Sequence, residues 1–155
     1  MVREAQMQSL ELPETGLAVA VDIGDEADIH PQNKREVGRR LAQWALTRTY
    51  GAADVPSGPL FAGATIERDG IRVRFRHVGR GLVAKGGELR TFVLAGGNGT
   101  FLSADAVIEG DTVRVSSPEV VAPLAVRYAW ADNPEGANLY NAEGFPAAPF
   151  RSDAW

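Results

Sequence analysis

One segment near the middle of the chain alternates apolar and basic residues without interruption. Residues 71–77 read Ile-Arg-Val-Arg-Phe-Arg-His. This period of two predicts an antiparallel β-strand that buries one face. Further strands are predicted at residues 60–67, 89–94, 100–108, 112–116 and 124–130. Hairpin turns are indicated at Asp69-Gly70, at residues 96–99 and at Gly110-Asp111. Short strands at this spacing favour an antiparallel β-sandwich.

The first third of the chain has a different pattern. Residues 17–23 are a short apolar run, which predicts a strand buried on both faces of a parallel sheet. Residues 31–49 predict a helix, with Pro31 at its first position and Gly51 as its stop signal. Its expected apolar stripe is Val37, Leu41, Trp44, Ala45 and Leu46. Its expected polar face is Lys34, Arg35, Arg39, Arg40, Gln43 and Arg48.

These patterns predict an α+β fold in two parts. Residues 1–52 are interpreted as a partial α/β unit, and residues 59–155 as a β-sandwich domain with an ordered C-terminal tail. Residues 52–59 form the connector, since they carry chain breakers every few positions. Residues 1–10 lack the basic start and apolar stretch of a signal peptide. They are interpreted as part of a helix that has already begun. We therefore expect the natural polypeptide to begin earlier.

Composition excludes several classes of function. A length of 155 residues with 45% hydrophobic residues is enough for a sizeable core. A net charge of −4 without a basic block argues against nucleic-acid binding. The absence of cysteine removes disulfides, thiolate catalysis and thiolate-bound zinc. The apolar runs are too short for a membrane span, and no spacing of His, Asp and Glu indicates a metal site. We expect no cofactor.

The best candidate for chemistry is His30, which follows the predicted buried strand and directly precedes the predicted helix. Ligands of open α/β sheets bind outside the carboxyl ends of the strands. Three aspartates and a glutamate lie within the eight residues before His30, so a carboxylate could orient it as a general base. From the residues alone, a helix-capping loop in which Asp28 stabilises the helix N-terminus is equally favoured.

Other candidates have simpler interpretations. His77 is expected to be a packed residue at a strand end, and Arg72, Arg74 and Arg76 a solvated strand face. The glycines of residues 96–99 lack the Lys-Ser/Thr of a phosphate loop and predict a turn. Five aromatic residues are expected to fill the seam between the two parts rather than to form a sugar-stacking surface: Trp130, Tyr140, Phe145, Phe150 and Trp155.

Several longer motifs carry a resemblance to a known family. They are Val2-Arg-Glu-Ala-Gln6, Asp22-Ile-Gly-Asp25, Asp28-Ile-His-Pro-Gln-Asn-Lys34, Val37-Gly-Arg-Arg-Leu-Ala42, Asn133-Pro, Asn138-Leu-Tyr-Asn141, Glu143-Gly-Phe-Pro146 and Pro149-Phe-Arg151. Together they resemble the sialate O-acetylesterase family, which consists of SGNH-type carbohydrate esterases. The resemblance spans essentially the whole chain but only the C-terminal third of a full family member. It implies the last strand and helix of an SGNH hydrolase domain followed by a β-sandwich.

The resemblance implies a Ser-His-Asp hydrolase that acts on acetyl esters of sugars. His30 matches the family's catalytic histidine. SGNH enzymes often carry Asp-x-x-His there, whereas this chain has Ala27 at that spacing. Asp28 is our first choice for the orienting carboxylate and Asp25 the second, while Asp22 is expected to brace the loop.

The nucleophile is not found in this sequence. Ser9, Ser57, Ser103, Ser116, Ser117 and Ser152 all lie outside Gly-Asp-Ser and Gly-x-Ser-x-Gly motifs. The family's Gly-Asp-Ser block lies upstream, so the expected partner is the missing N-terminal hydrolase portion, and the chain alone is expected to be inactive. Full-length relatives are expected to be exported. The alternative is a stand-alone, non-catalytic β-sandwich module with a structural or carbohydrate-contacting role.

Overall fold

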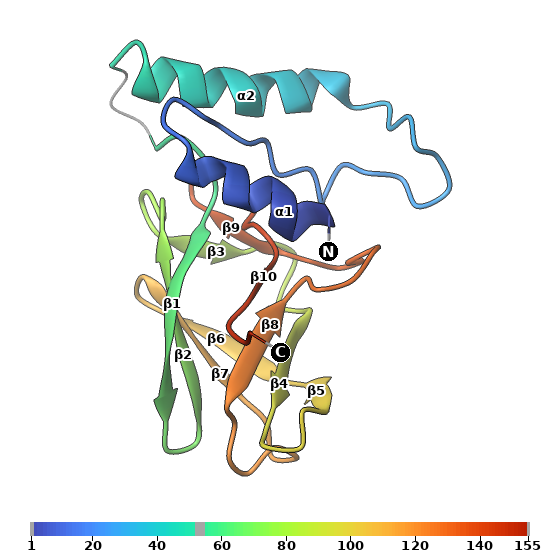
Figure 1. Ribbon diagram of the computed structural model, residues 1–155, viewed down its shortest axis with the longest axis vertical. Helices are drawn as coiled ribbons and strands as arrows, with labels where there is room; N and C mark the ends of the chain where they lie inside the picture. The colour runs from blue at the N-terminus through green and yellow to red at the C-terminus, as the bar shows by residue number, and fades with distance from the viewer. Residues whose placement is uncertain (1, 52–54, 155) are drawn as a thin grey trace.

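The computed structural model describes residues 2–51 and 55–154 (Figure 1). Helix α1 (Val2–Gln8), the 3₁₀ turn η1 (Ser9–Glu11) and helix α2 (Lys34–Arg48) lie together at one end of the molecule, beside a body of antiparallel strands. The chain is therefore a small α+β fold dominated by antiparallel sheets, as predicted. Among the described helices, none is long and apolar enough to cross a membrane.

The strands of the described residues form two sheets of four and one of two. The first sheet has the order β1 (Leu60–Glu67), β2 (Gly70–Arg76), β7 (Thr112–Ser116) and β6 (Asp105–Glu109). The second has the order β10 (Phe150–Arg151), β8 (Ala125–Tyr128), β4 (Phe92–Ala95) and β5 (Phe101–Ser103). The third pairs β3 (Leu82–Ala84) with β9 (Leu139–Asn141).

One hydrophobic core lies between the two larger sheets. Val73 and Val115 from the first sheet are completely buried, as are Leu94 and Val126 from the second. The apolar positions of β2 face this core while its arginines point outward, which confirms the alternation predicted for residues 71–77. Arg72 is only half-buried and pairs with Glu67 and Glu109.

The predicted hairpin turns are present. β1 and β2 pair from Glu67 to Gly70 around a two-residue turn, and β6 and β7 pair from Glu109 to Thr112 in the same way. Gly70 is required for packing as well, because a Cβ there would lie 2.3 Å from the carbonyl oxygen of Val115. The close match between local sequence and structure here follows from contacts between near neighbours in the chain.

Two strand predictions need correction. The segment 100–108 divides into β5 and β6, because the chain leaves one sheet and enters the other around Ala104. The tail after residue 131 was expected to be an ordered loop, but it contributes β9 and β10. Both strands are very short, and their partners lie far away in the sequence, so no local pattern marks them.

The predicted strand at residues 17–23 is wrong. The segment is extended and then turns, and it joins no sheet. Its carbonyls are instead bound by side chains of α2: the Trp44 indole donates to Leu17 O at 2.8 Å, and Arg40 donates to Val19 O. A strand needs a neighbouring strand to satisfy its backbone groups, whereas here the helix satisfies them.

Helix α2 also differs from its prediction. It begins at Lys34 rather than at Pro31, because the Asn33 side chain caps it by accepting from Glu36 N at 3.2 Å. The predicted apolar stripe is largely exposed, with Leu41 at 48% and Leu46 at 49%, while Arg40 of the predicted polar face is buried at 5%. The reason is that Arg40 is paired with two carboxylates, described below, which the hydrophobic pattern does not register.

Candidate functional site

The loop before α2 holds the three predicted site residues close together in sequence and structure. Asp25 Oδ1 accepts from the backbone N of Ala27 at 2.9 Å, and Asp28 Oδ1 accepts from the backbone N of His30 at 2.7 Å. Both are side-chain-to-backbone turns of the kind that Asp favours. Each carboxylate therefore uses one oxygen to shape the loop.

His30 lies exposed at the end of this loop. Its backbone carbonyl accepts a hydrogen bond from Gln32 Nε2 at 3.4 Å. Within residues 2–51 and 55–154, neither Asp28 nor Asp25 bonds to the imidazole. The structure thus brings His30, Asp28 and Asp25 into one loop without assembling them into a hydrogen-bonded pair.

A side-chain hydrogen bond connects the loop to the β region. Asn133 Nδ2 donates to Glu26 Oε2 at 2.8 Å, from a turn more than one hundred residues further along the chain. In Figure 1 the loop before α2 and this turn, coloured orange, project on the same side of the molecule. The candidate loop is therefore held from both regions.

Asp22 braces the start of the loop, as predicted. Its carboxylate forms a bidentate pair with the Arg40 guanidinium, with Nη1–Oδ1 at 2.6 Å and Nη2–Oδ2 at 2.8 Å. Tyr140 OH, on β9, also donates to Asp22 Oδ2 at 3.0 Å. Arg40 Nε donates to Glu36 Oε1 at 3.0 Å, so this buried cation has two carboxylate partners. The cluster joins the loop, α2 and β9.

The electrostatics of this cluster follow from burial and charge pairing. Burial works to raise the pKa of Asp22, but the hydrogen bond and attraction from Arg40 outweigh it and hold that pKa below its usual value. The hydrogen bond from Arg39 contributes most to lowering the pKa of Glu36 to about 2. Burial, reinforced by the Asp22 charge, raises the pKa of Tyr140. At neutral pH the two carboxylates are therefore ionised and the phenol is protonated.

A serine–histidine pair lies elsewhere, and sequence reasoning did not find it. Ser57 Oγ and His77 Nδ1 are 2.8 Å apart. Ser57 Oγ also lies 2.9 Å from the carbonyl of Gly58, and its single proton can serve only one of these acceptors. The register of the β1–β2 hairpin, in which Leu60 pairs with Arg76, is the signal that could have brought the two residues together.

This pair lacks the features of a nucleophile and its base. Ser57 is only 6% exposed. Burial, with help from Arg48 and Arg76, lowers the pKa of His77 to about 4, so the imidazole is neutral near pH 7. Its ring packs edge-on against Trp44 with centroids 5.7 Å apart. The predicted role of His77 as a packed residue at the strand end fits this geometry.

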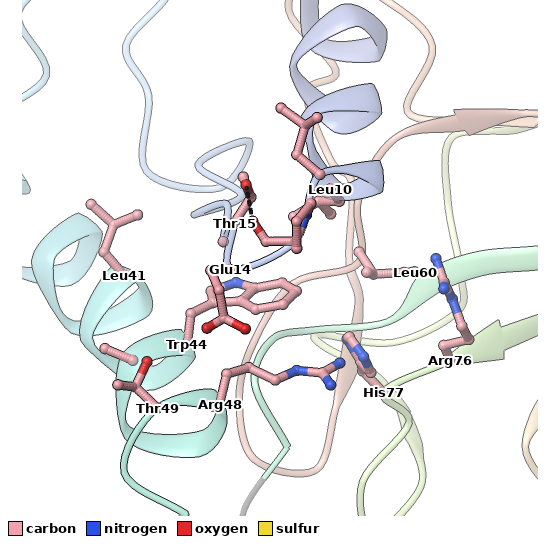
Figure 2. A pocket seen from close by; sticks show the side chains of 14 residues that line it. Leu10, Glu14, Thr15, Leu41, Trp44, Arg48, Thr49, Leu60, Arg76 and His77 are labelled. Atoms are coloured by element: carbon pink, nitrogen blue, oxygen red, sulfur yellow. Dashed lines mark hydrogen bonds between the residues drawn. The ribbon is translucent and has the colours of Figure 1, made fainter.

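A pocket of about 530 Å³ opens beside His77. Figure 2 shows Trp44 and Arg48 from α2, Glu14 from the preceding loop, and Arg76 with His77 from the end of β2 around it. The described lining does not include Ser57. A molecule in this pocket would therefore contact His77 but not Ser57.

The predicted seam residues divide into two groups. Tyr140 bonds Asp22, and the Phe145 ring lies 4.3 Å from the guanidinium carbon of Arg39, so these two do join the helices to the sheets. Phe150 belongs to the core, where it stacks on Phe61 at 4.6 Å. Trp130 is half-buried near two arginines, and Trp155 lies outside the described residues.

No group of His, Asp and Glu in the described part of the chain is arranged to hold a metal ion. The candidate loop offers an imidazole and several carboxylates. An exposed imidazole can accept a proton from a hydroxyl group placed against it.

Comparison with solved structures finds a carbohydrate acetylesterase from Xanthomonas citri, with a TM-score of 0.93 and 44% sequence identity. The match covers 99% of this chain and 36% of that chain. No family model and no curated protein sequence matches. The chain is thus related to a carbohydrate acetylesterase and spans about a third of its length.

Proposed function

We propose that this chain forms part of a carbohydrate O-acetylesterase that hydrolyses acetyl esters on sugars by a Ser-His-Asp mechanism. The observation that carries the proposal is the similarity to the Xanthomonas citri acetylesterase, at 44% identity over nearly the whole chain. In this proposal α2 and the loop before it are the end of an SGNH-type hydrolase domain of the sialate O-acetylesterase kind, and the strands form its β-sandwich companion.

His30 acts as the general base in this proposal. Its exposed imidazole takes the proton of a serine hydroxyl supplied by the remainder of the enzyme, and later returns it to the leaving sugar oxygen. Asp28 or Asp25 orients the imidazole. Each aspartate has a second carboxylate oxygen beyond the one that shapes the loop, and this oxygen is the one proposed to accept from the imidazole.

Assembly with the remaining part of an acetylesterase is the direct test. The chain should replace the matched segment of the Xanthomonas citri enzyme, and acetate release from an acetylated oligosaccharide should be measured. We expect the chimera to be active and His30→Ala to lower kcat on the order of 10⁴-fold. His77→Ala is the matched control and should leave kcat within a few-fold.

The aspartates are compared in the same chimera. The orienting carboxylate should lose on the order of 10⁴-fold in kcat when changed to asparagine, which favours the wrong imidazole tautomer. An active His30→Ala chimera would refute the proposed role of this loop. A folded chimera without any activity would instead favour the non-catalytic β module.

A further inference from the structure

A second pocket, of about 430 Å³, is lined in part by the loop that leads to His30. One wall consists of Val21, Asp22 and Gly24, which belong to that loop. The opposite wall is formed by Lys85, Arg90 and the turn at residues 133–138. Its volume falls within the range of small-molecule sites, roughly 300–1,000 Å³. The pocket therefore joins the candidate catalytic loop to the β region.

Two cations line this pocket. Lys85 Nζ lies 3.6 Å from the centre of the Tyr140 ring, and Arg90 Nη2 donates to the carbonyl of Gly86 at 3.2 Å. Within the described part of the chain, neither cation forms an ion pair with a carboxylate. Both side chains are exposed and keep further N–H donors for an incoming group.

A buried asparagine builds the cationic wall. Asn138 is 7% exposed and its side chain makes three hydrogen bonds to the segment between the two cations. Its Nδ2 donates to the carbonyls of Lys85 at 3.0 Å and Glu88 at 2.8 Å, while its Oδ1 accepts from the backbone N of Arg90 at 3.0 Å. Both cations are therefore fixed at their backbones.

The turn at residues 133–138 also lies against Arg90. Gly136 adopts φ +81°, and a Cβ there would lie 3.7 Å from Arg90 Cδ and 4.0 Å from Nη1. The guanidinium stem therefore runs along the turn.

The carboxylates around the pocket do not cancel these cations. The charge of Asp22 is balanced by Arg40, which binds both of its oxygens. Glu135 lines the pocket as an exposed side chain at the turn. Lys85 and Arg90 thus outnumber the one remaining carboxylate of the lining.

We propose that this pocket binds the carboxylate of an acidic sugar, with Lys85 and Arg90 as its ligands. The inference rests on the proposed function and adds a substrate class to it. A sugar held in this pocket lies against the loop that carries His30. A guanidinium and an ammonium both form charge-assisted hydrogen bonds with a carboxylate, whereas a neutral sugar offers them only hydroxyl groups. The acetylated substrate preferred by the enzyme is then one that carries a uronic acid.

The test is a titration of the isotope-labelled 155-residue chain followed by NMR, with sodium glucuronate and glucose as probes. Glucuronate should shift the amide signals of residues 85–90 and 133–138, and glucose at the same concentration should not. Lys85→Gln and Arg90→Gln should each weaken glucuronate binding about tenfold. Glu135→Gln should strengthen it, because one repelling charge is removed.

Arg68→Gln is the matched control, since Arg68 is a 96% exposed cation in the β1–β2 turn, outside this pocket. It should leave binding unchanged. Equal binding of glucose and glucuronate would overturn the proposal, as would binding that survives Lys85→Gln combined with Arg90→Gln. Sodium acetate serves as a further probe: shifts of equal size at equal concentration would show an adventitious anion site and refute the sugar assignment.

The outcome is separable from the esterase test. Glucuronate binding by this chain requires neither His30 nor a serine nucleophile. Binding without activity in the chimera would remove the proposed function and leave the acidic-sugar site standing. Activity of the chimera without glucuronate binding would support the proposed function and refute the acidic-sugar site.

Discussion

The β region and the helical region of this chain are stabilised to different degrees by apolar and polar contacts. Between residues 55 and 154, completely buried aliphatic and aromatic side chains from two sheets form one continuous core. Between residues 2 and 51, the only buried side chains are Arg40 and Trp44, and both bond to carbonyls of the loop at residues 17–22. The β region is thus stabilised mainly by hydrophobic burial. The helical region depends on these polar bonds, on the Tyr140–Asp22 bond to β9 and on a small apolar cluster in which Trp44 packs against Leu60 and Ala148.

This difference indicates which substitutions should destabilise each region. Hydrophobic burial is spread over many residues and tolerates water at its edges. A buried ion pair concentrates its effect in a few atoms, and loss of one partner leaves the other charged and poorly solvated. The loop that carries His30 belongs to the second kind.

The largest effect is expected from a cavity in the β core. Leu94 is completely buried between the sheets. Leu94→Ala should lower the free energy of unfolding by about 4 kcal/mol. Urea denaturation followed by circular dichroism measures this change. Leu124→Ala is the control, because Leu124 is 54% exposed, and a loss as large as that of Leu94→Ala would mean that the core is placed wrongly.

Removal of the polar anchor should come next. Arg40→Ala leaves the carboxylate of Asp22, which is 14% exposed, without its main partner. We expect a loss of about 3 kcal/mol. Hydrogen exchange should show that residues 17–48 lose protection while β2, β4, β7 and β8 keep theirs. Arg35→Ala is the matched control, since Arg35 is an exposed residue of the same helix. Uniform loss of protection across both regions would contradict the contrast drawn here.

The same contrast explains what could be predicted from the sequence. The period of two in β2 and the turns around it depend on near neighbours, so β1, β2 and β7 were predicted closely. β3 pairs with β9 more than fifty residues away, and both are three residues long, so neither left a local signal. The strand expected at residues 17–23 failed because an apolar run does not show whether a neighbouring strand exists.

The candidate site was partly predictable for a similar reason. The positions of His30, Asp28 and Asp25 in the sequence predict that they lie in one loop. Their hydrogen bonds cannot be predicted in this way, because an aspartate two residues before a backbone N–H can accept from that N–H as readily as it can orient a ring. The burial of Arg40 depends on Asp22, eighteen residues earlier, and on Tyr140, so hydropathy placed it on the wrong face. Ser57 and His77 meet only through the register of a hairpin.

The junction between the regions should also respond to pH. His77 lies at this junction, against Trp44, and its pKa is lowered to about 4, mainly by burial and further by Arg48 and Arg76. An unfolded chain takes up a proton at this position near pH 6.5, whereas the folded chain stays neutral down to about pH 4. More protons are then bound in the unfolded state, so stability is present above pH 6.5 and is lost as the pH falls toward 4.

The expected loss between pH 7 and pH 5 is about 1 kcal/mol, because solvent screening at this half-buried ring reduces the effect of the full pKa shift. Thermal unfolding at a series of pH values measures it. His77→Gln should flatten this part of the profile. A profile that His77→Gln does not alter would show that the burial of this ring has no effect on folding.

The smallest effect on stability is expected at two exposed leucines of α2. Leu41 and Leu46 are about half exposed, and Leu41 lines the pocket that also contains Trp44. Exposed apolar groups promote association between molecules. Replacement of both leucines by lysine should change the free energy of unfolding by less than about 0.5 kcal/mol, because neither side chain is buried. Sedimentation should nevertheless show that self-association of the parent chain at high concentration is lost in this variant. Leu124→Lys, on the β region, is the control and should leave association unchanged. If the parent chain is already monomeric, or if the double variant unfolds, then α2 is covered or supported in a way that the contrast between the two regions does not describe.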